Sequence, residues 1–123
     1  MNLIINPEDI EKWPLEKHIG VLSKLLFDGQ NMTVLWSQWN PGASAPEHTH
    51  PHEQIGVCFS GEMIFTSNDQ DLVVHAGEYY HIPCTAPNAE RNDGTEVAIL
   101  TDFFSPVRSD LLRRQFDPTI IQK

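Results

Sequence analysis

The stretch that decides the fold is Pro41–Gly61, PGASAPEHTHPHEQIGVCFSG. Three histidines and a glutamine occupy alternate positions in it: His48, His50, His52 and Gln54. Side chains of an extended strand alternate between two faces, so these four predict one polar face. Residues 55–59 then have bulky side chains at odd positions and small ones at even positions. The pattern predicts a strand whose odd face packs on the core and whose histidine face opens onto a metal or ligand site.

Length and composition bound the class of protein. The 123 residues suffice for one domain with a single core. The chain is 40% hydrophobic and 20% charged, which is typical of a soluble globular protein. A net charge of −9 argues against nucleic acids and anionic membranes as partners, because both attract basic surfaces. We therefore predict a single domain over residues 1–123 that binds neither.

The sequence also predicts a cytoplasmic location. Acidic residues at Glu8, Asp9 and Glu11 fall where a secretory signal needs an apolar run. No uninterrupted apolar run is long enough to span a bilayer. Cys58 and Cys84 form no Cys-x-x-Cys motif, which is typical of reduced cysteines.

Short helical caps are predicted at both ends. Asn6 and Pro7 have the pattern of a helix start, an N-cap followed by proline at the first helical position, and Pro14 ends this helix. Residues 19–27 are apolar enough for a strand or a short turn, and the sequence leaves both open. A second short helix is predicted to begin at residues 109–110 and to continue through residues 111–115.

Between the caps the chain has the pattern of short strands separated by Gly, Pro, Asn and Asp. Residues 32–37 alternate with a period of two, and Asn40-Pro41-Gly42 predicts a turn that ends this strand. Further predicted strands are residues 48–59, with a break or bulge near Pro51, and residues 62–67, 72–75, 79–82 and 96–104. Short strands at regular spacing indicate an all-β sandwich or barrel.

The motifs resemble those of the cupin superfamily. Its first motif is a glycine, five residues, His-x-His, three or four residues, a glutamate, six residues and a glycine. Gly42, His48, His50 and Gly61 fit this spacing, and Gln54 takes the glutamate position. The resemblance implies a double-stranded β-helix, or jelly-roll barrel, whose core spans about residues 30–105.

The second cupin motif is matched less completely. It is a glycine, five residues and a proline, followed by glycine, histidine and asparagine at set intervals. Gly77, Pro83 and Asn92 fit, whereas Thr85 replaces the glycine and Asn88 replaces the histidine ligand.

A narrower resemblance is to the pectin degradation protein family of the KdgF type. It rests on His-Thr-His-Pro-His-Glu-Gln followed by Ser-Gly-Glu, then Tyr-Tyr-x-Ile-Pro, then Asp-Phe-Phe-Ser-Pro-Val-Arg. These small cupins convert 4,5-unsaturated uronates from pectin and alginate breakdown into linear keto sugars. In that family a glutamine is itself a metal ligand, which implies this role for Gln54. The functional residues that the resemblance implies are Asp102, Phe104 and Arg108.

The chemistry of the histidine stretch supports a divalent metal site. His48, His50 and Gln54 offer two imidazoles and an amide oxygen, a neutral ligand set. Without a carboxylate ligand the ion keeps its full charge, which favours a Lewis-acid role over redox chemistry. Asn88 or His52 is expected to complete the site, and Zn, Ni, Mn and Fe all remain candidates. The alternative is a solvated loop.

Asp102 is the second candidate. A carboxylate on an apolar strand face is costly to bury unless it is partnered or catalytic, and burial raises its pKa toward that of a proton-transfer group. The alternatives are an outward position near the strand end or a pair with an arginine. Arg108 would clamp a substrate carboxylate or form a surface salt bridge, and Phe104 would be a pocket wall or plain core.

Three functions follow from these residues. The first is a metal-dependent isomerase or lyase that opens and ketonises unsaturated uronates. The second is a non-catalytic domain that binds a small acid at a weakened metal site, and the third is another metal-dependent isomerase or lyase on the cupin scaffold. By analogy with cupins we also expect a homodimer, with residues 3–5 as a candidate contact, either as an edge strand or packed under the barrel.

Overall fold

The computed structural model describes residues 4–111 of the chain. Nearly all of their regular structure is β-strand, so the predicted all-β class is confirmed. The two predicted caps are single 3-10 turns, η1 (Pro7–Asp9) and η2 (Ser109–Leu111), and helix is therefore a minor component. The predicted continuation through residues 112–115 lies outside the described residues. Ile4 and Ile5 belong to no strand, and Leu3 is not described.

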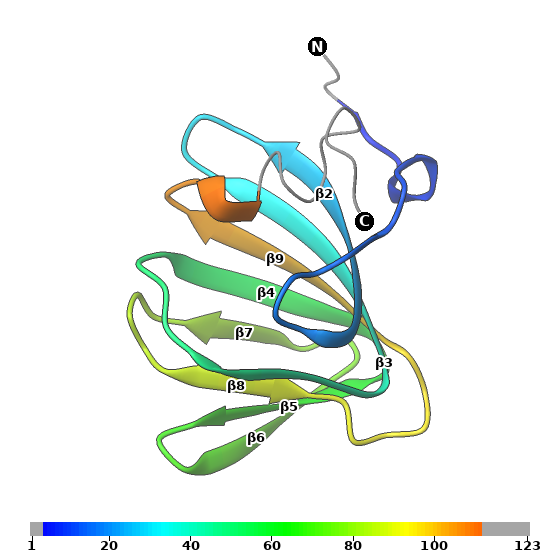
Figure 1. Ribbon diagram of the computed structural model, residues 1–123, viewed down its shortest axis with the longest axis vertical. Coiled ribbons are helices and arrows are strands. Elements are labelled where there is room, and N and C mark those ends of the chain that lie inside the picture. Colours follow the sequence, from blue (N-terminus) through cyan, green and yellow to red (C-terminus); the bar gives the residue numbers. More distant parts are fainter. Residues whose placement is uncertain (1–3, 112–123) are drawn as a thin grey trace.

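Within residues 4–111, nine strands form one antiparallel sheet that curves into a nearly closed barrel (Figure 1). The strands are β1 (Trp13–Pro14), β2 (Ile19–Asp28), β3 (Thr33–His48), β4 (Glu53–Ser60), β5 (Glu62–Ser67), β6 (Gln70–His75), β7 (Tyr79–Ile82), β8 (Asn88–Arg91) and β9 (Ala98–Ser105). Their order is β6-β5-β8-β3-β9-β4-β7, with β2 and β1 added beside β3. Residues 19–27, which the sequence left open, are a strand.

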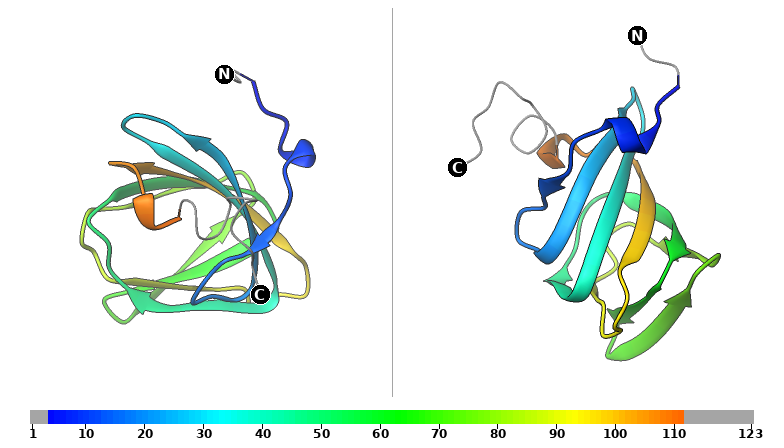
Figure 2. Two further views of the ribbon diagram at one scale, coloured as in Figure 1. Left: turned by 45° about the horizontal axis from the view of Figure 1, so that its top comes forward. Right: turned by 90° about the vertical axis from the view of Figure 1, so that its right-hand side faces the viewer.

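The long strand β3 joins the two sides of the barrel (Figure 2). Its residues 33–39 pair with β9 and its residues 44–48 pair with β8. The predicted turn at Asn40–Gly42 is wrong, because the strand runs through it. Gly42 has a φ of 84°, a conformation that costs little without a Cβ and lets the strand bend instead of ending.

The histidine stretch divides between two elements, and the break predicted near Pro51 is confirmed. His48 is the last residue of β3, residues 49–52 form the connection, and β4 begins at Glu53. Pro51 lies inside the connection and has no N–H for a ladder hydrogen bond. Two of the three histidines are therefore held by a turn.

The odd-numbered face of β4, however, does not pack on the core as predicted. Side chains at its even positions 54–58 are buried, whereas Ile55 is 46% and Phe59 is 60% exposed. The small even-numbered residues face the barrel interior, where larger side chains of neighbouring strands need the space. The apolar odd positions lie on the outer face of the sheet, although Val57 is buried there.

The barrel core is built from inward side chains of several strands. It includes Leu35, Trp39, Met63, Leu100 and Phe104. Leu15 and Leu111 join the same core from the segments before β2 and after β9, which anchors both of these segments on the barrel. None of the helical turns within residues 4–111 has the length and apolarity needed to cross a membrane.

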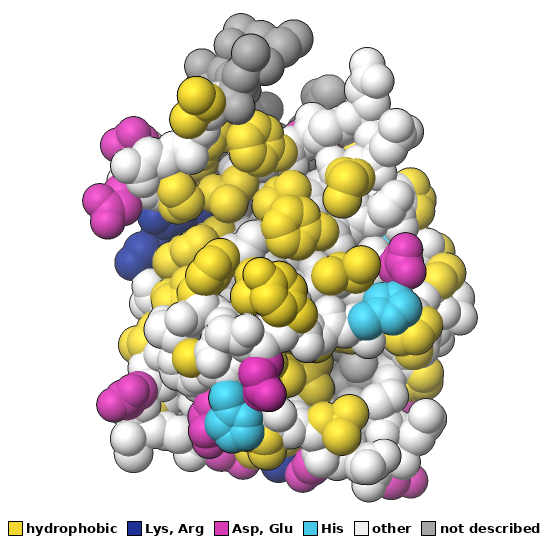
Figure 3. Space-filling view, turned by 180° about the vertical axis from the view of Figure 1, so that it is seen from behind, with side chains coloured by type: hydrophobic (Ala, Val, Ile, Leu, Met, Phe, Trp, Pro, Cys, Tyr) yellow, Lys and Arg dark blue, Asp and Glu magenta, His cyan; other side chains and the backbone are white. Residues whose placement is uncertain are grey.

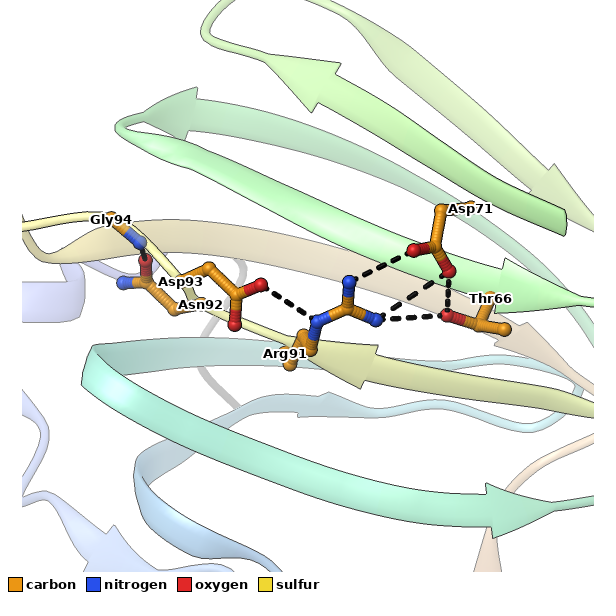
Figure 4. A network of polar contacts seen from close by, with 6 residues as sticks. All are labelled: Thr66, Asp71, Arg91, Asn92, Asp93 and Gly94. Atoms are coloured by element: carbon orange, nitrogen blue, oxygen red, sulfur yellow. Dashed lines mark hydrogen bonds and ion pairs between the residues drawn. The ribbon is translucent and has the colours of Figure 1, made fainter.

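A polar network fastens β8 from its outer side (Figure 4). Arg91 pairs with Asp71 of β6 at 2.9 Å and with Asp93 at 2.8 Å, and it donates to the Thr66 hydroxyl of β5. Residues of a strand alternate in direction, so this outward anchor leaves Glu90 facing the interior.

Candidate functional site

The barrel contains a cavity of about 770 Å³. Side chains of β3, β4, β7, β8 and β9 line it, together with residues 15–18 and residues 108–111. The predicted site residues that line it are His48, His50, Gln54, Asp102, Phe104 and Arg108. Residues far apart in sequence therefore meet in one place.

His48 and His50 lie side by side at the cavity. Their ring centroids are 5.9 Å apart. His48 donates its Nδ1 hydrogen to the Pro46 carbonyl at 2.8 Å, which leaves the Nε2 lone pair available. His50 is buried, and its Nε2 lies 3.1 Å from Gln54 Oε1. Burial lowers the pKa of His50, so its neutral form is favoured.

The amide of Gln54 has a defined orientation. Its Nε2 donates to Asp102 Oδ1 at 2.8 Å, and a carboxylate accepts only from the amino group of an amide. Gln54 Oε1 is therefore directed to His50. The 3.1 Å between this oxygen and His50 Nε2 suits two adjacent ligands of one cation at about 2.1 Å each, once the imidazole proton moves to Nδ1.

Asp102 lies deep in the barrel, so the expected alternative of an outward position is excluded. It is 5% exposed and accepts hydrogen bonds on Oδ1 from Gln54 and from the Tyr80 hydroxyl. Desolvation raises the pKa of Asp102 to about 6, although both hydrogen bonds oppose this rise. Its ionised and neutral forms are thus both accessible near neutral pH, as proton transfer requires.

Tyr80 of β7 is a further site residue, to which the sequence patterns assigned no role. Its hydroxyl donates to Asp102 Oδ1 at 2.5 Å, and burial raises its pKa well above the usual value. The contact depends on Gly56 of β4, because a Cβ there would overlap the Tyr80 ring and the Asp102 carboxylate. A glycine inside a strand, which often marks a close approach, was the available signal.

Glu90 is a second carboxyl group that the sequence reasoning missed. It is 6% exposed, lines the cavity, and has no hydrogen-bond partner for Oε2 among the described residues. Desolvation, and next the Asp102 charge, raise the pKa of Glu90 to about 8. Nothing in the local sequence Asn-Ala-Glu-Arg distinguishes it from a surface acid.

The Glu90 carboxyl predicts a pH-dependent stability. Its pKa rises from 4.5 unfolded to about 8 folded, so the folded state alone holds this proton between these values. Stability from Glu90 is complete below pH 4.5 and decreases as pH rises to 8, by about 1.4 kcal/mol per pH unit. We expect Glu90→Gln to remove this slope, measured as urea unfolding between pH 7 and 8 in EDTA. Parallel profiles of the two proteins would contradict the assignment.

Phe104 and Arg108 form one wall of the cavity. Phe104 is buried with its ring edge-to-face to His50 at 5.7 Å, and the Arg108 guanidinium lies 4.7 Å from the Phe104 ring centre. Arg108 also donates through Nε and Nη2 to the Asp110 carboxylate. Arg108 thus forms a salt bridge and also lines the cavity.

The two candidates for the remaining ligand differ in position. Asn88 pairs with His48 in the β3–β8 ladder, donates Nδ2 to Ala86 O, and is not among the described residues that line the cavity. Its Oδ1 is buried without a partner in the described part of the chain. His52 lines the cavity and donates Nε2 to Val107 O at 3.3 Å.

His18 also reaches the site. It precedes β2, and its ring centroid lies 6.3 Å from that of His48 and 5.7 Å from the Trp39 ring. Its Nδ1 donates to the Glu16 carbonyl at 2.7 Å. Burial lowers the pKa of His18.

The residues present are compatible with a metal ion but do not form a closed site. Within residues 4–111 no three His, Cys, Asp or Glu side chains converge closely enough to hold an ion by themselves. The amide oxygen of Gln54 is outside those residue types. The buried Asn88 Oδ1 lacks a partner among the described residues, which is the unpaired state expected of an oxygen that a ligand would satisfy.

The family follows from a direct match. A family model for the cupin domain matches residues 35–104, more than half of the chain. The chain belongs to the cupin family. The predicted superfamily and the jelly-roll fold are both confirmed.

Solved cupin structures share the whole fold of this cupin. An RmlC-like cupin from Shewanella frigidimarina superposes with a TM-score of 0.81 at 21% identity, covering 91% of this chain and 97% of that one. KdgF from a Halomonas species gives 0.77 at 21% identity, covering 91% and 99%. The polyketide cyclase RemF from Streptomyces resistomycificus gives 0.80 at 18% identity, covering 92% and 88%. At these identities the likeness shows the fold alone.

A curated relative has a regulatory name. The HTH-type transcriptional regulator PuuR of Escherichia coli (strain K12) is 26% identical over 108 residues, which cover 85% of this cupin. The chain spans 57% of the length of that regulator.

Proposed function

We propose that this cupin is a metal-dependent enzyme that opens and ketonises 4,5-unsaturated uronates. The observation that carries the proposal is the contact series His50–Gln54–Asp102–Tyr80 at the floor of one cavity. It joins a candidate ligand pair to a buried carboxyl group. The substrate class rests on the resemblance of the motifs around His48, Tyr80 and Asp102 to those of the KdgF-type family.

His48, His50 and Gln54 would hold the ion, with Asn88 or His52 as further candidates. A divalent ion there supplies Lewis-acid polarisation of substrate oxygens. The neutral donors suit Zn, Ni, Mn and Fe, and they leave the positive charge of the ion uncompensated.

Asp102 would move the proton. Removal of the proton from the C1 hydroxyl of the uronate breaks the C1–O5 bond, which leaves an aldehyde at C1 and an enolate at C5. Return of the proton to C4 gives the ketone, so the conversion is an isomerisation and needs no water or oxidant. Tyr80 and Gln54 hold Asp102 Oδ1, and its second oxygen remains for the substrate.

Arg108 and Phe104 would position the substrate. Asp110 engages Nε and Nη2 of Arg108, so Nη1 remains to donate to the uronate carboxylate. The Phe104 ring beneath the guanidinium restricts where this donor can lie. The stacked arrangement would orient the sugar ring over Asp102.

The test is turnover of fresh lyase product. Protein loaded separately with Zn, Ni, Mn or Fe is added, and loss of the enol-acid absorbance is followed against an EDTA-treated sample. Acceleration that EDTA removes supports the proposal. A decay unchanged from the spontaneous rate with every metal would exclude it.

A second candidate is a binding domain without turnover. The observation in its favour is Asn88, which stands at a ligand position and bonds to Ala86 O. The likeness to the regulator PuuR also fits a domain that senses a small molecule. Calorimetric binding of an unsaturated uronate that persists unchanged for hours would favour this function over catalysis. A different metal-dependent isomerisation on the same residues is the third candidate, and it would show turnover only with other substrates.

We also propose that this cupin acts in the cytoplasm as a homodimer. Cys58 and Cys84 are free thiols, which suits a reducing compartment. Figure 3 looks onto the outer face of the sheet and shows hydrophobic side chains gathered over its middle. The pairing of β2, β3, β9, β4 and β7 puts one apolar residue of each strand on this face: Phe27, Val34, Phe103, Ile55 and Tyr79.

The size of this outer face suits a second copy of the chain. Stable interfaces bury roughly 800 Å² per partner. The exposed side chains of Phe27, Ile55, Phe59, Tyr79 and Phe103 supply roughly 100 Å² each. Part-buried neighbours such as Trp36 add to this area. Like-charged copies at −9 each need an apolar contact of this kind to associate.

A charge on this face is expected to separate the dimer. We expect light scattering to give twice 14.0 kDa for the wild type and 14.0 kDa for Phe59→Lys. Leu72→Lys, at an equally exposed apolar position on β6, should remain dimeric. A monomeric wild type at tens of micromolar would contradict the proposal.

A further inference from the structure

His18 has the same hydrogen-bond arrangement as the candidate ligand His48. Each ring donates Nδ1–H to a backbone carbonyl two residues earlier, Glu16 for His18 and Pro46 for His48. This bond fixes the tautomer and leaves the Nε2 lone pair available. A second nitrogen that donates to a carbonyl is the usual support of a metal-binding imidazole. The chain thus contains two imidazoles prepared in this way beside one cavity.

His18 and Asn88 flank His48 from opposite sides. Asn88 is the ladder partner of His48 on β8, whereas His18 precedes β2, whose first residue Ile19 pairs with Ser44 of β3. His18 lines the cavity and Asn88 is not among its described lining residues. On the β8 side of His48 the neighbouring residue is Asn88, which has no imidazole. On the β2 side the neighbouring residue is His18, which supplies one.

We propose that His18 is a metal ligand of this cupin, together with His48, His50 and Gln54. It supplies the third imidazole that Asn88 does not. The inference rests on the metal site of the proposed function and is independent of which substrate that site converts.

The ring spacing sets what binding requires. Two imidazoles that bind one ion through Nε2 at about 2.1 Å have ring centroids at most about 6.5 Å apart. His18 and His48 are at 6.3 Å, and His48 and His50 are at 5.9 Å. Each pair is within this limit, which corresponds to nitrogens on opposite sides of the ion. A smaller N–metal–N angle requires the two rings to rotate toward the ion. Glu16 and Lys17, which precede β2, are exposed and His18 is half-buried, so His18 has room for this movement.

The test is metal affinity measured on the full chain without substrate. Calorimetric titration with Zn²⁺ is expected to show at least a tenfold weaker Kd for His18→Ala, whereas His75→Ala, at an exposed histidine, should match the wild type. Co²⁺-substituted wild type should lose intensity in its visible absorption when His18 is replaced. Unfolding in EDTA is measured for each variant, and His18→Gln replaces His18→Ala if the latter is not folded.

A Kd for the folded His18 variant within threefold of the wild type would overturn the inference. A second arm adds Asn88→His to His18→Ala. If His18 supplies the imidazole that Asn88 lacks, a histidine at position 88 should recover most of the metal affinity lost in His18→Ala. Failure of uronate turnover with a confirmed loss of affinity would reject the proposed substrate and leave His18 as a ligand.

Discussion

Asp102→Asn is expected to reduce uronate turnover by about 10²–10⁴-fold while leaving the fold and the metal affinity intact. Both hydrogen bonds at this position end on Oδ1, one from Gln54 and one from Tyr80. An asparagine oxygen can accept both, so the orientation of the Gln54 amide is preserved. The amide cannot exchange a proton with substrate near neutral pH, and only this step is lost.

The measurement combines turnover with metal titration and unfolding. Asp69→Asn is the matched control, because Asp69 lies in an exposed turn with a positive φ that asparagine also accepts. Since Asp102 is buried at a raised pKa, replacing it should keep or increase stability at pH 8. Turnover within threefold of the wild type would remove Asp102 from the mechanism.

Gly56→Ala is expected to lower both stability and metal affinity. The new Cβ would overlap the Tyr80 ring and the Asp102 carboxylate. Neither group can move away easily, because Tyr80 packs against the core and Asp102 is buried and hydrogen-bonded to Gln54. Overpacking of this kind costs about 1–3 kcal/mol and lowers Tm by roughly 5–15 °C. Displacement of Asp102 also breaks its hydrogen bond with Gln54 Nε2, so Gln54 Oε1 is no longer held toward His50 and metal affinity decreases.

Gly94→Ala provides the control for this prediction. A Cβ at Gly94 would meet only Asn92 Oδ1, at 3.3 Å, so a small loss of stability and no change in metal affinity are expected. Thermal unfolding in EDTA and Zn²⁺ titration report the two effects separately. If Gly56→Ala unfolded and bound metal as the wild type does, Tyr80 and Asp102 would not be packed through Gly56.

Local sequence patterns correctly predicted strands that begin and end at turns. The segments β5 (Glu62–Ser67) and β7 (Tyr79–Ile82) agree with the predicted residues 62–67 and 79–82. Patterns failed where long-range pairing overrides a local signal. Asn40-Pro41-Gly42 resembles a turn, yet β3 continues through it because β8 and β9 hold its two halves.

The inside and outside of β4 show a second limit. Bulky residues are expected in the core, but the interior beside Gly56 is filled by Tyr80 and Asp102 from neighbouring strands. The apolar odd positions are therefore left on the outer face, where Ile55 and Phe59 are exposed. A period of two predicts that two faces differ and does not say which of them is buried.

The opening stretch Pro41–Gly61 was enough to predict the cupin superfamily, its jelly-roll fold and the three candidate ligands His48, His50 and Gln54, because the spacing of these residues is local to the chain. Tertiary structure decided what surrounds them. It placed Tyr80 against Asp102, buried Glu90 in the same cavity, and brought His18 beside His48. Two of these contacts join residues more than twenty positions apart in the sequence. The third, the burial of Glu90, depends on which face of β8 is turned inward when the sheet curves into a barrel. The ligand spacing is therefore a property of sequence, and the proton-transfer environment is a property of the closed barrel.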